Sequence, residues 1–493
     1  MSMRKMLAAD FGASSGRVMA GSYDGKCLRI SQVHRFANEP VYLGNTMYWD
    51  FLRLFHELKV GIGKAGDLGG ADSIGVDTWG VDFGLVGSDG HLLENPVHYR
   101  DARTTGMLEE GFGRLDQKRF YEITGNQFME INTAFQLLSL VKERPDFLQK
   151  ADKLLLMPDL FNYYLSGAAC SEYTIASTTQ LLDAAGRDWS KEVLEKLSIP
   201  KNLFLPVVAP GTDLGAMQTA VCRELNTAPM SVVAVAGHDT QCAMAAVPAL
   251  QDDFIFVSCG TWSLFGTELK EPVIDENSLR YNVTNEGAFG GRISFLKNII
   301  GLWLVQESRR QWAREGMEYD FGQLEELASK EAGGGSFIDP DDPVFVPAGN
   351  VPERIRRYCE KSGQRIPGSP AQIVRCIDES LALKYHIALD EIRACTGKEY
   401  EAIYMVGGGT QSSLLCQLVA DVCKIPVYAG PVEATVYGNL AIQLSAVKEV
   451  NGLSQIRQLI RESEEIRVYE PENTGRWEET YQWFCEKIAG KEF

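Results

Sequence analysis

Val232-Val-Ala-Val-Ala-Gly-His-Asp-Thr240 has the pattern of a buried β-strand that ends in a carboxylate. The β-branched run stops at Gly237, and the polar residues His238 and Asp239 follow at once. In α/β folds, buried parallel strands are apolar throughout and deliver functional side chains to the carboxyl edge of the sheet. Asp239 could instead be the N-cap of a helix that begins at Thr240. The stretch therefore predicts an α/β fold, with Asp239 either as a catalytic carboxylate or as a helix cap.

The size and charge of the chain restrict its class. A chain of 493 residues exceeds what one hydrophobic core usually holds, so two domains of about 200–250 residues are expected. A net charge of −18 argues against nucleic acid or an anionic membrane as the main partner. No apolar run is long enough to span a membrane, and Asp10 comes too early for a signal peptide. The 11 cysteines have no paired metal-site spacing, which is typical of reduced thiols in a cytoplasmic protein.

One hairpin pattern occurs twice, about 250 residues apart in the chain. Asp10-Phe-Gly-Ala-Ser-Ser-Gly-Arg17 and Ser258-Cys-Gly-Thr-Trp-Ser263 each lie between two apolar strands. Both copies place a small or acidic residue first, a glycine two positions later, and Ser or Thr near the tip. A period near half the chain length indicates duplicated domains. We expect one domain over residues 1–246 and the other over 247–493.

Apolar spacing and capping signals predict several further elements. Helices are expected over 135–142 and 159–165, where apolar residues recur at three and four positions. A long helix should begin at Pro370 after the cap Ser369 and end at Gly397. The remaining expectations are a strand over 401–406, a helix over 414–422, a last helix over 477–488 and a surface loop over 332–352.

Three glycine-rich turns follow apolar strands, at 10–17, 258–263 and 407–413. Glycine lets backbone N–H groups approach an anion closely, and neighbouring hydroxyls add hydrogen-bond donors. Together these turns predict a polyphosphate site. The chain contains no P-loop sequence, and no G-x-G-x-x-G turn leads into a helix, so P-loop enzymes and dinucleotide oxidoreductases are disfavoured.

The chain resembles, nearly end to end, the FGGY family of carbohydrate kinases in the actin-like ATPase superfamily. The segments that carry the resemblance are Asp10–Arg17, Gly75-Val-Asp-Thr-Trp-Gly-Val-Asp-Phe83, Gly237–Thr240, Gly260–Leu264, Thr284-Asn-Glu-Gly287, Lys297–Gln306 and Val406–Gly409. The forms at 13–17, 77–82 and 99–104 are similar to the branch that phosphorylates L-rhamnulose. Asn132-Thr-Ala-Phe-Gln-Leu137 stands where glycerol and xylulose kinases typically carry a Lys and a Trp. That departure argues against glycerol and xylulose as substrates.

The resemblance implies a fold and a role for each matching residue. It implies two duplicated ribonuclease-H-like domains with a central cleft, the first mainly sugar-binding and the second mainly ATP-binding. Asp239 would be the general base, and Asp10 would act on Mg²⁺ through bound water. The residues implied for ATP are Ala13, Ser14, Ser15, Gly16, Arg17, Thr261, Gln306, Gly408 and Gly409. Those implied for the sugar are Gly80, Gly237, His238, Asp239 and Asn298.

Two positions in the 75–83 segment keep alternatives open. Asp82 is a rival base, because it is also an acid at a strand end. Trp79 either stacks on the apolar face of the sugar or belongs to the core. In Gly407–Gly409 we expect the absence of side chains to leave room for the nucleotide.

The expected activity is ATP-dependent phosphorylation of L-rhamnulose to L-rhamnulose 1-phosphate in L-rhamnose catabolism, with Mg²⁺. The expected partners are ATP and a small ketose, in a cytoplasmic monomer or homodimer, with neither nucleic acid nor membrane. One alternative is a kinase for another ketose such as L-fuculose. A remote alternative is a non-catalytic, sugar-sensing actin-like protein, which would lack the base or the metal-binding acid.

Overall fold

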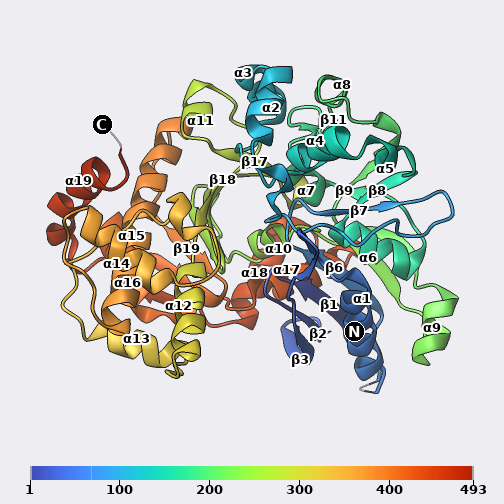
Figure 1. Cartoon of the computed structure of the whole chain (residues 1–493). Coiled ribbons are helices and arrows are strands. Elements are labelled where there is room, and N and C mark those ends of the chain that lie inside the picture. The colour runs from blue at the N-terminus through green and yellow to red at the C-terminus, as the bar shows by residue number, and fades with distance from the viewer. Residues whose placement is uncertain (1–2, 68, 491–493) are drawn as a thin grey trace. The chain divides into compact units, whose positions relative to one another are not determined.

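A computed structural model describes residues 3–67 and 69–490, and its contacts divide the chain into two compact units (Figure 1). Unit 1 comprises Met1–Leu250, Leu269–Phe295 and Ala434–Ser463, and unit 2 comprises Gln251–Glu268, Leu296–Glu433 and Glu464–Phe493. Both units are discontinuous in sequence. A single division after residue 246 would assign the two later segments of unit 1 to the second domain.

The sheet of unit 1 has the strand order β13-β14-β6-β1-β2-β3. Its strands are β1 (Arg4–Phe11), β2 (Ser15–Tyr23), β3 (Leu28–Ala37), β6 (Ser73–Thr78), β13 (Thr212–Ala216) and β14 (Ser231–Ala234). The central pairs β1–β6 and β6–β14 are parallel, as the apolar run before Gly237 predicts. The outer pairs β1–β2, β2–β3 and β13–β14 are antiparallel. The carboxyl ends of β1, β6 and β14 therefore meet at one edge.

The second sheet repeats this pattern. Its order is β17-β18-β16-β15-β19-β20-β21. Its strands are β15 (Ile255–Cys259), β16 (Trp262–Leu269), β17 (Thr284–Gly287), β18 (Ile293–Ile300), β19 (Ile403–Val406), β20 (Val427–Ala429) and β21 (Arg467–Tyr469). The pairs β15–β16 and β20–β21 are antiparallel, whereas β15–β19 and β19–β20 are parallel. Four consecutive pairs thus run antiparallel, parallel, parallel and antiparallel in both sheets, which confirms a duplicated α/β fold.

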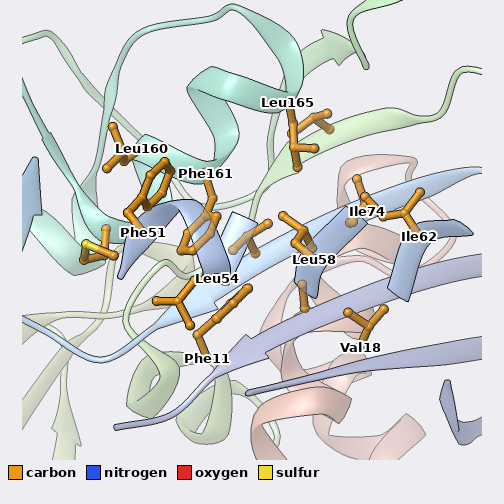
Figure 2. Close-up of a cluster of buried hydrophobic side chains, with 14 of the residues drawn as sticks. Phe11, Val18, Phe51, Leu54, Leu58, Ile62, Ile74, Leu160, Phe161 and Leu165 are labelled. Carbon is orange, nitrogen blue, oxygen red and sulfur yellow. The ribbon is translucent and has the colours of Figure 1, made fainter. Parts of the chain in front are cut away.

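Helices cover both faces of the sheet in unit 1. On one face, α1 (Phe51–Asp67) and α6 (Met157–Ser166) pack on Phe11, Val18 and Ile74 (Figure 2). On the other face lies α17 (Ala434–Ala446), where a Cβ at Gly21 would collide with Leu440. Val18 and Gly21 stand three positions apart in β2. The side chain of Val18 and a Cβ at Gly21 therefore point to opposite faces of the sheet. The acids Asp10 and Asp77 point to the α17 face, because Phe11 and Ile74 point to the α1 face.

The remaining helices complete the two units. In unit 1 they include α2 (Met107–Arg114), α3 (Gln117–Thr124), α4 (Thr133–Glu143), α5 (Pro145–Gln149), α7 (Tyr173–Ala176), α8 (Lys191–Lys196), α9 (Thr219–Leu225), α10 (Asp239–Ala245), α11 (Glu276–Arg280) and α18 (Gly452–Ser463). In unit 2 they include α12 (Trp303–Arg314), α13 (Phe321–Ser329), α14 (Val351–Lys361), α15 (Pro370–Thr396), α16 (Ser413–Cys423) and α19 (Trp477–Lys487). Among residues 3–67 and 69–490, no helix is long and apolar enough to cross a membrane.

Local signals predicted the boundaries of α15 closely. Ser369 caps α15 by accepting a hydrogen bond from the Gln372 N–H, and Gly397 ends the helix at φ 65°. The surface loop expected over 332–352 is partly wrong. Its apolar residues Ile338 and Phe345 are fully buried, and Pro352 lies in the first turn of α14. Burial of scattered apolar residues in a segment without periodicity depends on what packs over it, so local pattern did not reveal it.

Candidate active site

The carboxyl edge of the sheet in unit 1 gathers three carboxylates. Asp10 and Asp77 are register partners at the ends of the parallel strands β1 and β6. The Thr78 N–H donates to the Gly237 carbonyl at 2.9 Å, which brings the end of β14 beside them. Asp239 follows two residues later as the first residue of α10. Asp239 therefore lies at the carboxyl edge of the sheet, as expected.

Asp239 is not the N-cap of α10, and that alternative is wrong. The cap position belongs to His238, whose side chain makes no capping hydrogen bond. Asp239 Oδ1 accepts from the N–H and the hydroxyl of Thr240, at 2.6 and 3.2 Å. Burial raises the pKa of Asp239 to about 6, which Asp10 increases and His238 opposes. Its side chain still keeps 28% of its surface exposed, so it can meet a substrate.

Asp77 is a buried acid to which the motif analysis gave no role. Its Oδ2 accepts from Asn439 Nδ2 of α17 at 2.6 Å, and its Oδ1 has no hydrogen-bond partner among the described residues. Burial and the charge of Asp10 raise its pKa well above the ordinary range. Its sequence signal was its place directly after the short apolar run at 73–76.

Asp10 has a cationic partner that differs from expectation. The Arg17 Nε and Nη2 atoms donate to Asp10 Oδ2 at 2.9 and 2.7 Å. Ser15, Gly16 and Arg17 lie within β2, so only 12–14 form the tip of this hairpin. Asn38 holds that tip, since its N–H donates to the Ser14 carbonyl and its Nδ2 to the Gly12 carbonyl. The guanidinium expected at a phosphate thus pairs, in this structure, with the acid expected at Mg²⁺.

Gly80, Val81 and Asp82 form a γ-turn directly after β6. The Asp82 N–H donates to the Gly80 carbonyl at 2.9 Å, and Val81 has a φ of 67°. A positive φ strains a β-branched residue, so its surroundings must hold it there. Thr178 Oγ1 accepts from the Val81 N–H, and Thr133 Oγ1 donates to the Val81 carbonyl. Both threonines act from distant segments and were not predicted.

Asp82 is fully buried and anchors this turn. Its Oδ2 accepts from Trp49 Nε1, Trp79 Nε1 and the Tyr99 N–H at 2.6–3.1 Å. Its Oδ1 accepts from Gln136 Nε2 at 2.9 Å. Burial raises the pKa of Asp82 to about 6 against these donors. Both carboxylate oxygens of Asp82 accept hydrogen bonds and its side chain is fully buried, so Asp82 stabilises this turn. Trp79 belongs to the hydrophobic core.

Four of the expected sugar residues come together in unit 1, and we call Gly80, Gly237, His238 and Asp239 the acceptor site. His238 Nε2 lies 3.6 Å from Asp239 Oδ1 and 3.5 Å from where a Cβ on Gly80 would be. Gly237 is held by its N–H, which donates to Glu172 Oε2 at 2.9 Å. The fifth expected residue, Asn298, lies in β18 within unit 2.

Unit 2 brings together two of the residues expected at the nucleotide. Thr261 Oγ1 donates to Gln306 Oε1 at 3.3 Å. The Thr261 carbonyl accepts from the N–H groups of Gly301 and Trp303, which fixes the β15–β16 tip on the start of α12. This tip therefore presents a hydroxyl and an amide side by side, without a carboxylate.

Gly408 and Gly409 follow β19, and the space around a Cβ differs between the two positions. A Cβ at Gly408 would meet nothing within 4 Å, so this position is open as expected. A Cβ at Gly409 would collide with Cys259 Sγ. Gly409 thus lacks a side chain because β15 approaches it, and not because a nucleotide needs the room.

The fold defines the class of protein first. The structure is similar to the xylulose kinase from Lactobacillus acidophilus, with a TM-score of 0.80 at 17% identity over 98% of this chain and 97% of that one. It is also similar to Plasmodium falciparum glycerol kinase with ADP, with a TM-score of 0.78 at 16% identity over 98% and 97%. At these identities the likeness establishes a shared two-domain α/β fold.

The sequence comparisons identify the family. Residues 5–246 match the N-terminal domain of the FGGY family of carbohydrate kinases, and residues 255–447 match its C-terminal domain. The rhamnulokinase of Bacteroides thetaiotaomicron is 39% identical over 482 residues, 98% of this chain and 99% of the relative. That of Halalkalibacterium halodurans is 40% identical over 468 residues, 95% and 99%. The chain belongs to the FGGY family of carbohydrate kinases.

Proposed function

We propose that this carbohydrate kinase transfers the γ-phosphoryl group of ATP to L-rhamnulose, giving L-rhamnulose 1-phosphate in the cytoplasm. The observation that carries the proposal is the acceptor site, where a partly exposed carboxylate of raised pKa stands beside His238, and His238 in turn lies beside Gly80. Full-length relatives named rhamnulokinase support the choice of sugar.

Phosphoryl transfer requires an activated hydroxyl, positioned phosphates and neutralised charge. Asp239 would accept the proton of the attacking hydroxyl on the first carbon of the ketose. A base whose pKa lies near 6 is ionised at neutral pH and still takes a proton readily. His238 and Gly80 would contact the other oxygens of the sugar, with Asn298 as a further contact.

The nucleotide would be held mainly by residues of unit 2. Thr261, Gln306 and the Gly408–Gly409 turn provide hydroxyl, amide and backbone groups, and none of them carries a charge that repels phosphate. The hairpin residues 13–17 of unit 1 would contact the transferred phosphate, with Arg17 shared between Asp10 and a phosphate oxygen.

Asp10 would bind Mg²⁺ through water. The single carboxylate of Asp10 fits Mg²⁺, which keeps several waters and is held by one or two carboxylates and the phosphates of its nucleotide. When bound, the ion neutralises charge that develops on the transferred phosphoryl group.

The test is a coupled ADP-release assay over a panel of L-rhamnulose, L-fuculose, L-xylulose, L-ribulose and glycerol. We expect the highest kcat/KM with L-rhamnulose. If L-fuculose turned over better, the sugar assignment would move to that ketose. Preference for glycerol or xylulose would overturn the assignment, and no turnover of any acceptor would favour a sugar-sensing role.

A further inference from the structure

The Thr284-Asn-Glu-Gly287 segment forms β17, and all four residues are buried. Glu286 has 5% of its surface exposed, and its Oε2 lies 3.1 Å from His238 Nδ1. Both residues belong to unit 1. A buried carboxylate therefore stands behind the imidazole of the acceptor site, on the side away from Asp239.

Two further buried side chains hold this carboxylate in place. Gln241 Nε2 donates to Glu286 Oε2 at 3.1 Å, and Ser294 Oγ donates to Gln241 Oε1 at 2.7 Å. Gln241 and Ser294 are both fully buried. A chain of satisfied hydrogen bonds in a low-dielectric interior is rigid, so Glu286 has little freedom to leave His238.

The ion pair at Nδ1 restricts where the other ring nitrogen points. His238 Nε2 lies 3.6 Å from Asp239 Oδ1 and 3.5 Å from the place of a Cβ on Gly80, so it points toward these two residues. Oxygens on adjacent carbons of a sugar lie close together. A donor at Nε2 can therefore reach the second oxygen while Asp239 engages the first.

We propose that Glu286 is a positioning residue for the acceptor sugar: through Nδ1 it orients His238 so that Nε2–H donates to the oxygen next to the attacking hydroxyl. The inference rests on the proposed function, in which Asp239 deprotonates that hydroxyl. Gln241 and Ser294 support Glu286 from behind.

The charges around His238 agree with this role. The carboxylates that face it are Glu286 from β17, Asp239 from α10 and Glu172 from β9 (Ser171–Glu172). Burial alone would lower the pKa of His238, but these carboxylates, Glu286 foremost, outweigh it and raise that pKa. The doubly protonated ring is favoured, with one proton for Glu286 and one for the sugar.

The test is Glu286→Gln, which keeps the shape of the side chain but removes its charge. We expect the KM for L-rhamnulose to rise about 10- to 100-fold, the effect of losing one charge-assisted hydrogen bond. The KM for ATP should stay within about twofold. The ketose KM of the variant should also increase between about pH 6 and 8, since His238 then loses its second proton more easily, whereas the wild type should change little.

Two more variants make the outcome decisive. Ser294→Ala, at the outer end of the chain, should raise the ketose KM in the same direction by a smaller factor. The matched control is Asp421→Asn in α16, an equally buried carboxylate that accepts from Gln417 and the Glu472 N–H and should leave both KM values unchanged. An unchanged ketose KM in Glu286→Gln or Ser294→Ala, or an equal rise in both KM values, would overturn the inference. Failure of the proposed function differs, because the wild type itself would then turn over no ketose.

Discussion

The hairpins β1–β2 and β15–β16 share a strand pattern and differ in the chemistry of their tips. In the first, Asp10 pairs with Arg17 across the hairpin. In the second, Ser258 stands at the position of Asp10, and Thr261 meets Gln306 instead. The described edge of the first sheet gathers three carboxylates, whereas the second presents hydroxyl, amide and glycine backbone.

The difference agrees with the proposed function, in which each copy of a duplicated scaffold would serve one half of the reaction. Carboxylates suit the edge where a proton is removed and a cation is neutralised. The same charges beside a polyphosphate would repel it, which explains a neutral edge in unit 2. Substitutions at the two edges can test this contrast.

The largest effect should come from Asp239→Asn, which removes the proposed base from the acidic edge. We expect kcat to fall about 10²–10⁴-fold, because an amide cannot accept the proton. Binding of a non-hydrolysable ATP analogue, measured by calorimetry, should be unchanged. Asp82→Asn is the control, and it should lower the melting temperature instead, since its buried carboxylate accepts four hydrogen bonds. Wild-type turnover in Asp239→Asn would show that Asp239 is not the base.

Asp10→Ser replaces the aspartate of the first hairpin with the residue type that the second hairpin has at the matching position, Ser258. Loss of the charge near Mg²⁺ should reduce kcat/KM for ATP about 10²-fold, with partial recovery at raised Mg²⁺. Ser258→Ala at the matching position should cost less than about fivefold. Equal effects in the two hairpins, measured by the same ADP-release assay, would show that their division of labour is wrong.

The acidic edge should also show itself in a pH profile. The pKa of Asp239 is raised to about 6, so its carboxylate is ionised above that pH and protonated below it. We therefore expect kcat/KM for the sugar to fall about tenfold per unit below pH 6 and to level off above it. Circular dichroism at each pH separates this loss from unfolding. An activity that stays flat down to pH 5 would contradict the assignment.

The smallest effect should come from substitutions in the glycine turn after β19, at the neutral edge of unit 2. Gly409→Ala should lower the free energy of unfolding by about 1–3 kcal/mol, because its Cβ would collide with Cys259. Gly408→Ala, with open space around it, should stay within about 0.5 kcal/mol of the wild type. Urea denaturation measures both, and equal stabilities would refute the close packing of Gly409 on β15.

Much of the fold could be predicted because its signals are local. The apolar run before Gly237 predicted a parallel strand, and Ser369 and Gly397 predicted the ends of α15. Asp239 was found because it follows such a strand directly. Asp77, Thr178 and Glu286 were passed over, since each shows its importance only through a distant partner. Asn439, for example, reaches Asp77 across 362 positions of the chain.

The sequence by itself determined the α/β class, the duplicated hairpins and the edge at which the acids stand, because periodicity and turn residues act over a few positions. Only the tertiary structure decided that Asp10 pairs with Arg17, that Asp82 is enclosed by four donors, and that Glu286 stands behind His238. These outcomes depend on burial and on hydrogen bonds between distant segments. Such contacts exist only once the chain has packed.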